Sequence, residues 1–129
     1  MTHRFETEVF YEDTDMGGIV YHANYLKFIE RARSAWVRSL GIDQLAMRDQ
    51  GTLFVVRSMT CDFKAPARFE DRLTVQSQPQ DVSGARLILR QEVLREAVSL
   101  FSADVTLVCL TSSGRPTRLP GVLRSVMQA

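Results

Sequence analysis

Polar and apolar residues alternate at the start of the chain, and the spacing then becomes helical. Alternation over residues 5–11 predicts a strand that ends at Tyr11. Over residues 22–40, apolar residues recur every three or four positions and form one continuous stripe. This spacing predicts an amphipathic helix, and Gly41 follows it where helices commonly end. The stripe consists of Tyr25, Phe28, Ile29, Ala32, Trp36, Val37 and Leu40.

Four strand-like runs follow the helix after a short helical turn expected at residues 42–48. These runs cover residues 53–63, 72–80, 86–95 and 98–110. Ala65-Pro66-Ala67 ends the first run, and Ser83-Gly84 predicts a turn before the third. Prolines after residue 115 predict an irregular tail. The order of one strand, one long helix and four strands predicts an α+β domain, with one antiparallel sheet packed on the helix.

The composition is typical of an ordinary soluble globular protein. The 129 residues are 45% apolar and 24% charged, and 16 Lys and Arg nearly balance 15 Asp and Glu. This balance argues against a nucleic-acid partner. No run approaches the roughly 20 apolar residues of a membrane span, and residues 1–8 lack the apolar segment of a signal peptide. We therefore expect a single domain over residues 1–129, located in the cytoplasm.

The cysteines and histidines give no sign of a metal or redox site. Cys61 and Cys109 are far apart, and each lies in an apolar run where a free cysteine behaves as a small hydrophobe. The two histidines, His3 and His22, are not clustered with other ligands. We expect no bound metal.

The segment between the first strand and the helix carries the candidate chemistry. It reads Y-E-D-T-D-M-G-G-I-V-Y-H from Tyr11 to His22. A carboxylate just before a helix start can act as a base or nucleophile beside unpaired N–H groups that stabilise an oxyanion. The pattern indicates an enzyme, although Asp15 could also cap the helix or form a turn.

The same motif, continued by Asn24-Tyr25 and by Glu30-Arg31-Ala32-Arg33, resembles a known family. It is similar to the hotdog-fold acyl-CoA thioesterases of the 4-hydroxybenzoyl-CoA thioesterase type, and closest to their Tol-Pal-associated branch. The blocks Phe54-Val55-Val56-Arg57 and 62–68 share this resemblance. It implies the hotdog fold, a five-stranded antiparallel sheet wrapped around one long central helix. It also implies a homodimer or homotetramer with active sites at subunit interfaces.

The resemblance implies hydrolysis of an acyl-CoA to a free acid and coenzyme A, with Asp15 as nucleophile or general base. It further implies that the main-chain N–H of His22 polarises the thioester carbonyl. The His22 side chain and Tyr11 would support catalysis. We expect no cofactor, because the thioester supplies the reactive carbon, and an acyl carrier protein is a second possible substrate partner. The expected substrate contacts are Gly18, Val20, Tyr21 and Tyr25, with Arg57, Lys64 and Arg68 facing the phosphates of coenzyme A.

Two other carboxylates of the motif are assigned structural roles. Asp13 is expected to make a turn or to face solvent, because Asp is favoured at turn positions. Glu30 is expected to pair with Arg33 or Arg57, although a helix glutamate serves as the carboxylate in other hotdog thioesterases.

Two rival functions stay open. A hotdog hydroxyacyl dehydratase would aim a His–Asp or His–Glu pair at the Cα–Cβ bond of the acyl group, and it would hydrate an enoyl-CoA. A non-catalytic acyl-binding module would bind its ligand without turnover and would tolerate Asp15→Asn. The sequence leaves the acyl chain preference open.

Overall fold

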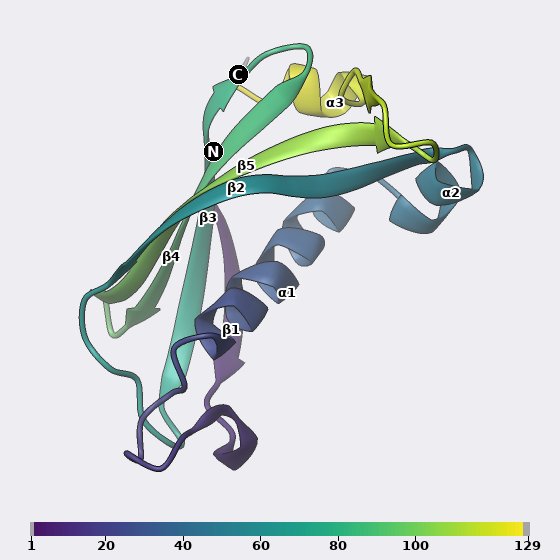
Figure 1. Cartoon of the computed structure of the whole chain (residues 1–129). Helices are drawn as coiled ribbons and strands as arrows, with labels where there is room; N and C mark the ends of the chain where they lie inside the picture. Colours follow the sequence, from purple (N-terminus) through teal and green to yellow (C-terminus); the bar gives the residue numbers. More distant parts are fainter. Residues whose placement is uncertain (1, 128–129) are drawn as a thin grey trace.

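The computed structural model describes residues 2–127 and shows a curved antiparallel sheet around a central helix (Figure 1). The strand order is β1-β3-β4-β5-β2, and a sixth strand, β6, pairs with β5. This is the predicted α+β arrangement, with a two-residue strand added to the expected five. The strands are β1 (His3–Glu8), β2 (Thr52–Phe63), β3 (Arg72–Val82), β4 (Arg86–Arg95), β5 (Val98–Thr111) and β6 (Pro116–Thr117). The helices are α1 (Asn24–Ser39), α2 (Gln44–Asp49) and α3 (Gly121–Arg124), with a 3-10 turn η1 (Tyr11–Asp13).

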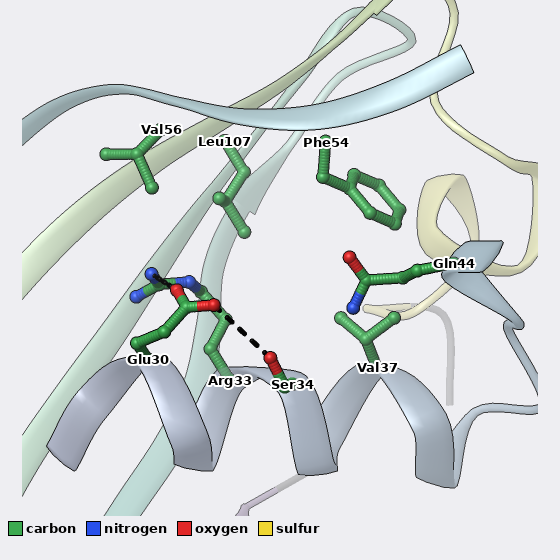
Figure 2. Close-up of a pocket in the computed structure, with 8 residues that line it drawn as sticks. All are labelled: Glu30, Arg33, Ser34, Val37, Gln44, Phe54, Val56 and Leu107. Atoms are coloured by element: carbon green, nitrogen blue, oxygen red, sulfur yellow. Dashed lines mark hydrogen bonds and ion pairs between the residues drawn. The ribbon is translucent and has the colours of Figure 1, made fainter. Parts of the chain in front are cut away.

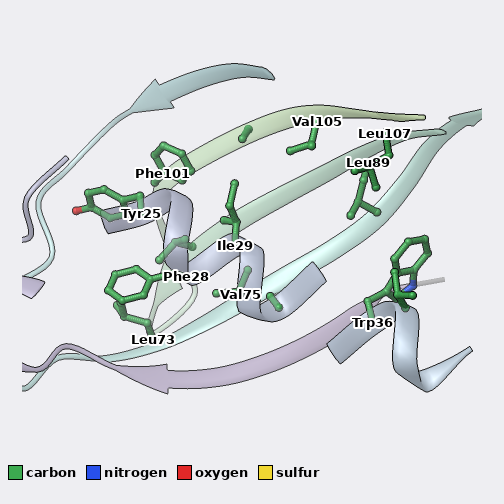
Figure 3. Packing of buried hydrophobic residues seen from close by; sticks show 14 of the residues in the cluster. Tyr25, Phe28, Ile29, Trp36, Leu73, Val75, Leu89, Phe101, Val105 and Leu107 are labelled. Carbon is green, nitrogen blue, oxygen red and sulfur yellow. The ribbon is translucent and has the colours of Figure 1, made fainter. Parts of the chain in front are cut away.

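Helix α1 buries its apolar stripe against the sheet (Figure 3). Phe28, Ile29 and Ala32 are fully buried, and Trp36 is almost fully buried, as the helical spacing predicted. Each large apolar side chain buried in this way contributes about 1.5–3 kcal/mol relative to an exposed one. The burial therefore fixes which face of α1 meets the sheet. Facing side chains of the sheet include Leu73, Val75, Leu89, Phe101 and Val105.

A buried polar network also ties α1 to β3 and β4. Arg33 Nη1 donates to Gln91 Oε1 at 2.9 Å, and Gln91 Nε2 donates to Ser77 Oγ at 2.9 Å and to the Ile29 carbonyl at 3.0 Å. Burial lowers the pKa of Arg33, although the neighbouring Glu30 carboxylate opposes this change. Buried polar groups must be paired, so this network fixes the position of the helix over the sheet.

Two elements near the motif have boundaries that differ from the prediction. Helix α1 begins at Asn24, later than expected, because the Asn24 N–H donates to the Tyr21 carbonyl at 2.8 Å and closes a turn before the helix. Strand β1 ends at Glu8, and the prediction that Tyr11 ends this strand was wrong. The Asp13 carboxylate accepts the Phe10 N–H at 2.9 Å, and this hydrogen bond draws the chain into η1.

The expected irregular tail is partly ordered, and that prediction was also wrong. Leu119 is 1% exposed and Leu123 is fully buried, so residues near α3 complete the core. Their apolar area outweighs the disruption by Pro116 and Pro120. None of the helices within residues 2–127 has the length and apolar character to cross a membrane.

Candidate active site

A small hairpin between η1 and α1 carries Asp15. Thr14 pairs with Val20 across the hairpin, and the Asp15 N–H donates to the Ile19 carbonyl at 2.9 Å. The Gly18 N–H donates to the Asp15 carbonyl at 3.0 Å, and Gly18 has a φ of +78°. A side chain disfavours this backbone conformation, so glycine makes the turn possible.

The Asp15 carboxylate is exposed and uses only one of its oxygens. Its Oδ1 accepts the Gly17 N–H at 2.9 Å, while no donor within residues 2–127 bonds Oδ2. A Cβ on Gly17 would lie 3.2 Å from Oδ1, so glycine here leaves room for the carboxylate. One oxygen is thus oriented, and the other is available to attack a carbonyl or accept a proton.

Asp13 lies only two residues away, but both of its carboxylate oxygens already accept hydrogen bonds. It is 3% exposed, and its Oδ1 and Oδ2 accept from Asn24 Nδ2 at 3.0 Å and from the Phe10 N–H at 2.9 Å. Its carbonyl accepts the Tyr21 N–H at 2.9 Å. These hydrogen bonds confirm the predicted turn role and fasten η1 to the start of α1.

His22 lies at the end of the hairpin, in the turn that leads into α1. Its main-chain N–H has no acceptor in the described part of the chain. Such an N–H at a helix start carries partial positive charge and suits an oxyanion. The exposed imidazole lies between the rings of Tyr21 and Phe63, with ring centroids at 4.7 and 6.0 Å.

An apolar pocket of about 290 Å³ opens beside His22. Tyr25 stacks on Phe101 with ring centroids 5.0 Å apart, and Phe63 packs at 5.0 Å from Phe101. Phe63 is 51% exposed, so one part of its ring is available to a ligand. The pocket can therefore take an apolar group next to the free N–H. Its lining residues are Ile19, Val20, His22, Tyr25, Phe63, Lys64, Ala65 and Pro66.

The structure brings together only some of the residues that the sequence singled out. Val20, His22, Tyr25 and Lys64 share the pocket. Tyr21 packs on His22 at its rim. Asp15 and Gly18 do not line it themselves, although Ile19 and Val20 of their hairpin do, and Tyr11, Arg57 and Arg68 do not line it either.

Tyr11, Arg57 and Arg68 each have a different setting. Tyr11 is 80% exposed in η1, and its ring meets only the edge of Phe69 at 6.2 Å. Arg57 lies at a bulge in β2, and its side chain is exposed. The Arg68 backbone pairs with Ile19, while its side chain is exposed. Sequence reasoning missed Phe63 as a pocket residue, although its place in an alternating run could have indicated it.

A separate, smaller cavity of about 70 Å³ lies between α1 and β2 (Figure 2). Glu30 faces this cavity and pairs with Arg33, which confirms the predicted ion pair. The Ser34 hydroxyl donates to Glu30 Oε1 at 3.3 Å. The cavity shares no lining residue with the pocket beside His22. Within residues 2–127, no three His, Cys, Asp or Glu side chains gather to form a metal site.

A curved antiparallel sheet around one helix is the arrangement of the hotdog fold. The sequence model that describes the thioesterase superfamily matches residues 17–101 of this chain. The chain therefore belongs to this superfamily. Both the expected family and the expected fold are therefore confirmed.

Individual relatives extend the match over most of the chain. The acyl-CoA thioester hydrolase YbgC of Escherichia coli O6:H1 is 40% identical over 119 residues, covering 91% of this chain and 89% of that protein. The acyl-CoA thioesterase YbgC of Haemophilus influenzae is 38% identical over 107 residues, covering 82% and 79%. The crystal structure of a probable thioesterase from Bartonella henselae superposes with a TM-score of 0.89 at 35% identity, covering 93% and 100%.

Proposed function

We propose that this protein is an acyl-CoA thioesterase that uses Asp15 as its catalytic carboxylate. One observation carries the proposal: a carboxylate with a free oxygen and an unpaired helix-start N–H lie on the same hairpin, which borders an apolar pocket. The names of the relatives, acyl-CoA thioesterase and acyl-CoA thioester hydrolase, agree with this chemistry.

Each part of the site has a role in hydrolysis. The acyl group enters the pocket beside Phe63, and the thioester oxygen accepts the His22 N–H, which stabilises the oxyanion. Asp15 then attacks the carbonyl carbon, or it takes a proton from the water that attacks. If Asp15 attacks, the C–S bond breaks and leaves an acyl–Asp15 anhydride, which water hydrolyses to the free acid and the regenerated carboxylate. If Asp15 acts as the base, the activated water displaces the thiolate directly. In both routes the coenzyme A thiolate gains a proton. This sequence requires no cofactor.

The remaining residues of the motif would assist. The His22 imidazole and the Tyr11 hydroxyl would support the carboxylate, and Gly18 and Tyr21 would shape the entrance to the pocket. Lys64, Arg57 and Arg68 would contact the phosphates of coenzyme A, since charge-assisted hydrogen bonds to phosphate are strong.

We also propose a homodimer, or a homotetramer built from dimers. Within residues 2–127, β2 pairs with β5 along one edge only, so its other edge is open to a second copy of this chain. Leu53 and Val56 on this strand are 38% and 39% exposed. Light scattering should give at least twice the mass of one chain, and a monomer at assay concentrations would contradict this. A cytoplasmic location, an acyl carrier protein partner and a link to the Tol-Pal system stay predictions.

Thiol release from a panel of acyl-CoAs tests the function. The unmodified protein should release thiol, and Asp15→Asn should reduce kcat by about a hundredfold or more, as expected for loss of the catalytic carboxylate. Glu12→Gln is the matched control, because it removes an exposed negative charge from the neighbouring turn. It should keep kcat within about twofold.

The same assay separates the rival functions. Equal thiol release by the unmodified protein and Asp15→Asn would contradict the proposed carboxylate. Hydration of an enoyl-CoA without thiol release would indicate a dehydratase. Binding of acyl-CoA without either reaction would indicate a non-catalytic acyl-binding module.

A further inference from the structure

The connector between β2 and β3 holds the hairpin that carries Asp15. The Ala67 carbonyl accepts the Val20 N–H at 2.9 Å, and Ile19 pairs with Arg68. On the other side, the Ala67 N–H donates to the Tyr25 hydroxyl at 2.9 Å. Ala67 is fully buried between the hairpin and α1. Its position therefore determines where the hairpin lies relative to the helix start.

An ion pair between Asp71 and Arg95 closes this connector. Asp71 Oδ2 accepts from Arg95 Nη1 at 2.7 Å and from the Arg68 N–H at 2.8 Å. Arg95 Nη1 also lies 3.3 Å from the Pro66 carbonyl oxygen, and the Asp71 carbonyl accepts the Val9 N–H at 2.9 Å. The side-chain pair thus joins β4 and the start of β3 to the residues on both sides of Ala67. The main-chain hydrogen bond of Asp71 adds the end of β1.

Two further observations indicate that this turn is held firmly. Glu70 has a φ of +73°, which a residue with a side chain adopts only when its surroundings enforce it. Its N–H donates to the Val9 carbonyl at 3.0 Å. Burial alone would raise the pKa of Asp71, but the hydrogen bonds from Arg68 and Arg95 and their charges lower it. Asp71 is therefore ionised at neutral pH and keeps the pair intact.

We propose that Asp71 and Arg95 are positioning residues for thioester hydrolysis. Their ion pair fixes the connector around Ala67, and Ala67 in turn fixes the hairpin that carries Asp15 and leads to His22. This inference rests on the proposed thioesterase function. Neither residue lines the pocket, and both hydrogen-bond to the connector, so we assign them a role in holding it.

The expected signature is a loss of kcat with KM preserved. A small displacement of catalytic groups can reduce the rate by up to about a hundredfold, and we expect Asp71→Asn and Arg95→Met to lower kcat at least about tenfold. KM should change less than about threefold, because the substituted side chains themselves do not line the pocket. Arg95→Lys should recover part of the rate, and the double variant should be no slower than the slower single one.

Arg90 and Asp104 provide a matched control. They form a similar pair between β4 and β5, at 3.4 Å, and the side chains of Arg90 and Arg95 are 36% and 35% exposed. Arg90→Met should lower the thermal midpoint by about as much as Arg95→Met while leaving kcat within about twofold.

Three outcomes would overturn the inference. The kcat of Arg95→Met could match that of Arg90→Met, its loss could appear in KM alone, or the double variant could multiply the two single losses. If Arg95→Met does not fold, Arg95→Lys and Asp71→Asn give the same comparison. Activity of the unmodified protein, with its loss in Asp15→Asn, tests the proposed function separately, so the two failures can be distinguished.

Discussion

The two ends of α1 differ in the side chains that they bury and in the backbone groups that they leave unpaired. At the N-terminal end, the His22 N–H has no acceptor in the described chain, Phe63 is half exposed and a pocket of about 290 Å³ is open. At the C-terminal end, Trp36 and Val37 are almost fully buried on the inner face, and a groove of about 450 Å³ opens on the outer side beside Arg38 and Gly41. The buried inner face at the C-terminal end stabilises the fold, while the N-terminal end places an unpaired N–H beside a pocket.

The backbone shows the same difference. The last turn of α1 is closed by the Leu40 and Gly41 N–H groups, which donate to Val37 and Arg38 carbonyls at 3.1 and 3.0 Å. Hydrogen bonds thus close the C-terminal end of the helix, while the N–H that precedes the helix stays free for an oxyanion. Substitutions at the closed end should therefore change stability, and substitutions at the open end should change activity.

The largest effect on stability is expected from Leu123→Ala in the core. Because Leu123 is fully buried, its truncation leaves a cavity and should lower the free energy of unfolding by about 2–5 kcal/mol. Denaturant unfolding measures this change, while kcat of the folded protein should stay within about twofold. Val122→Ala, at a neighbouring residue that is 40% exposed, should cost less than about 0.5 kcal/mol. Equal losses from both variants would contradict the packing account.

An intermediate effect is expected from Phe63→Ala at the open end. Loss of the half-exposed ring should reduce kcat/KM about tenfold for acyl groups that fill the pocket, because about 1.4 kcal/mol of apolar contact is lost. Phe69→Ala is the matched control, since Phe69 is 50% exposed but lies outside the pocket. Steady-state kinetics with acyl-CoAs of increasing size should show a size-dependent loss only in Phe63→Ala. A loss independent of acyl size would show that Phe63 does not contact the acyl group.

The smallest effect is expected from Lys64→Ala and Arg68→Ala. If these cations contact the phosphates of coenzyme A, each variant should raise KM about threefold and weaken its dependence on salt. Arg115→Ala, an exposed cation in the turn after β5, should change neither quantity. An effect of Arg115→Ala equal to the other two would indicate attraction by overall charge and not a phosphate site.

Local patterns predicted the elements that packing determines. The helical stripe of α1 and the alternation along β5 place apolar side chains on one face, and Ile29, Trp36, Phe101 and Val105 are buried as predicted. The order of strands and helix then predicted the sheet around α1. The ordered motif between Tyr11 and His22 also pointed to the loop that holds the candidate site.

Individual side-chain hydrogen bonds and contacts between distant segments were not predictable in this way. The Phe10 N–H bonds to Asp13 and redirects a chain that alternation alone continued as a strand to Tyr11. The pair of Asp71 and Arg95 joins residues 24 positions apart, and no local pattern indicates it. The packing of Leu123 depends on a core that forms only when the sheet closes over α1.

The central claim is that Asp15, and not Asp13, is the catalytic carboxylate, and Asp13→Asn compared with Asp15→Asn tests it most directly. Thermal unfolding and kcat should be measured for both variants. Asp15→Asn should lower kcat about a hundredfold or more with its thermal midpoint nearly unchanged, because its side chain is exposed.

Asp13→Asn should instead lower the free energy of unfolding by about 1–3 kcal/mol, because its buried hydrogen bonds are disrupted. The folded fraction of that variant should keep most of its kcat. Undiminished kcat in Asp15→Asn, or an equal loss of stability in both variants, would contradict the account.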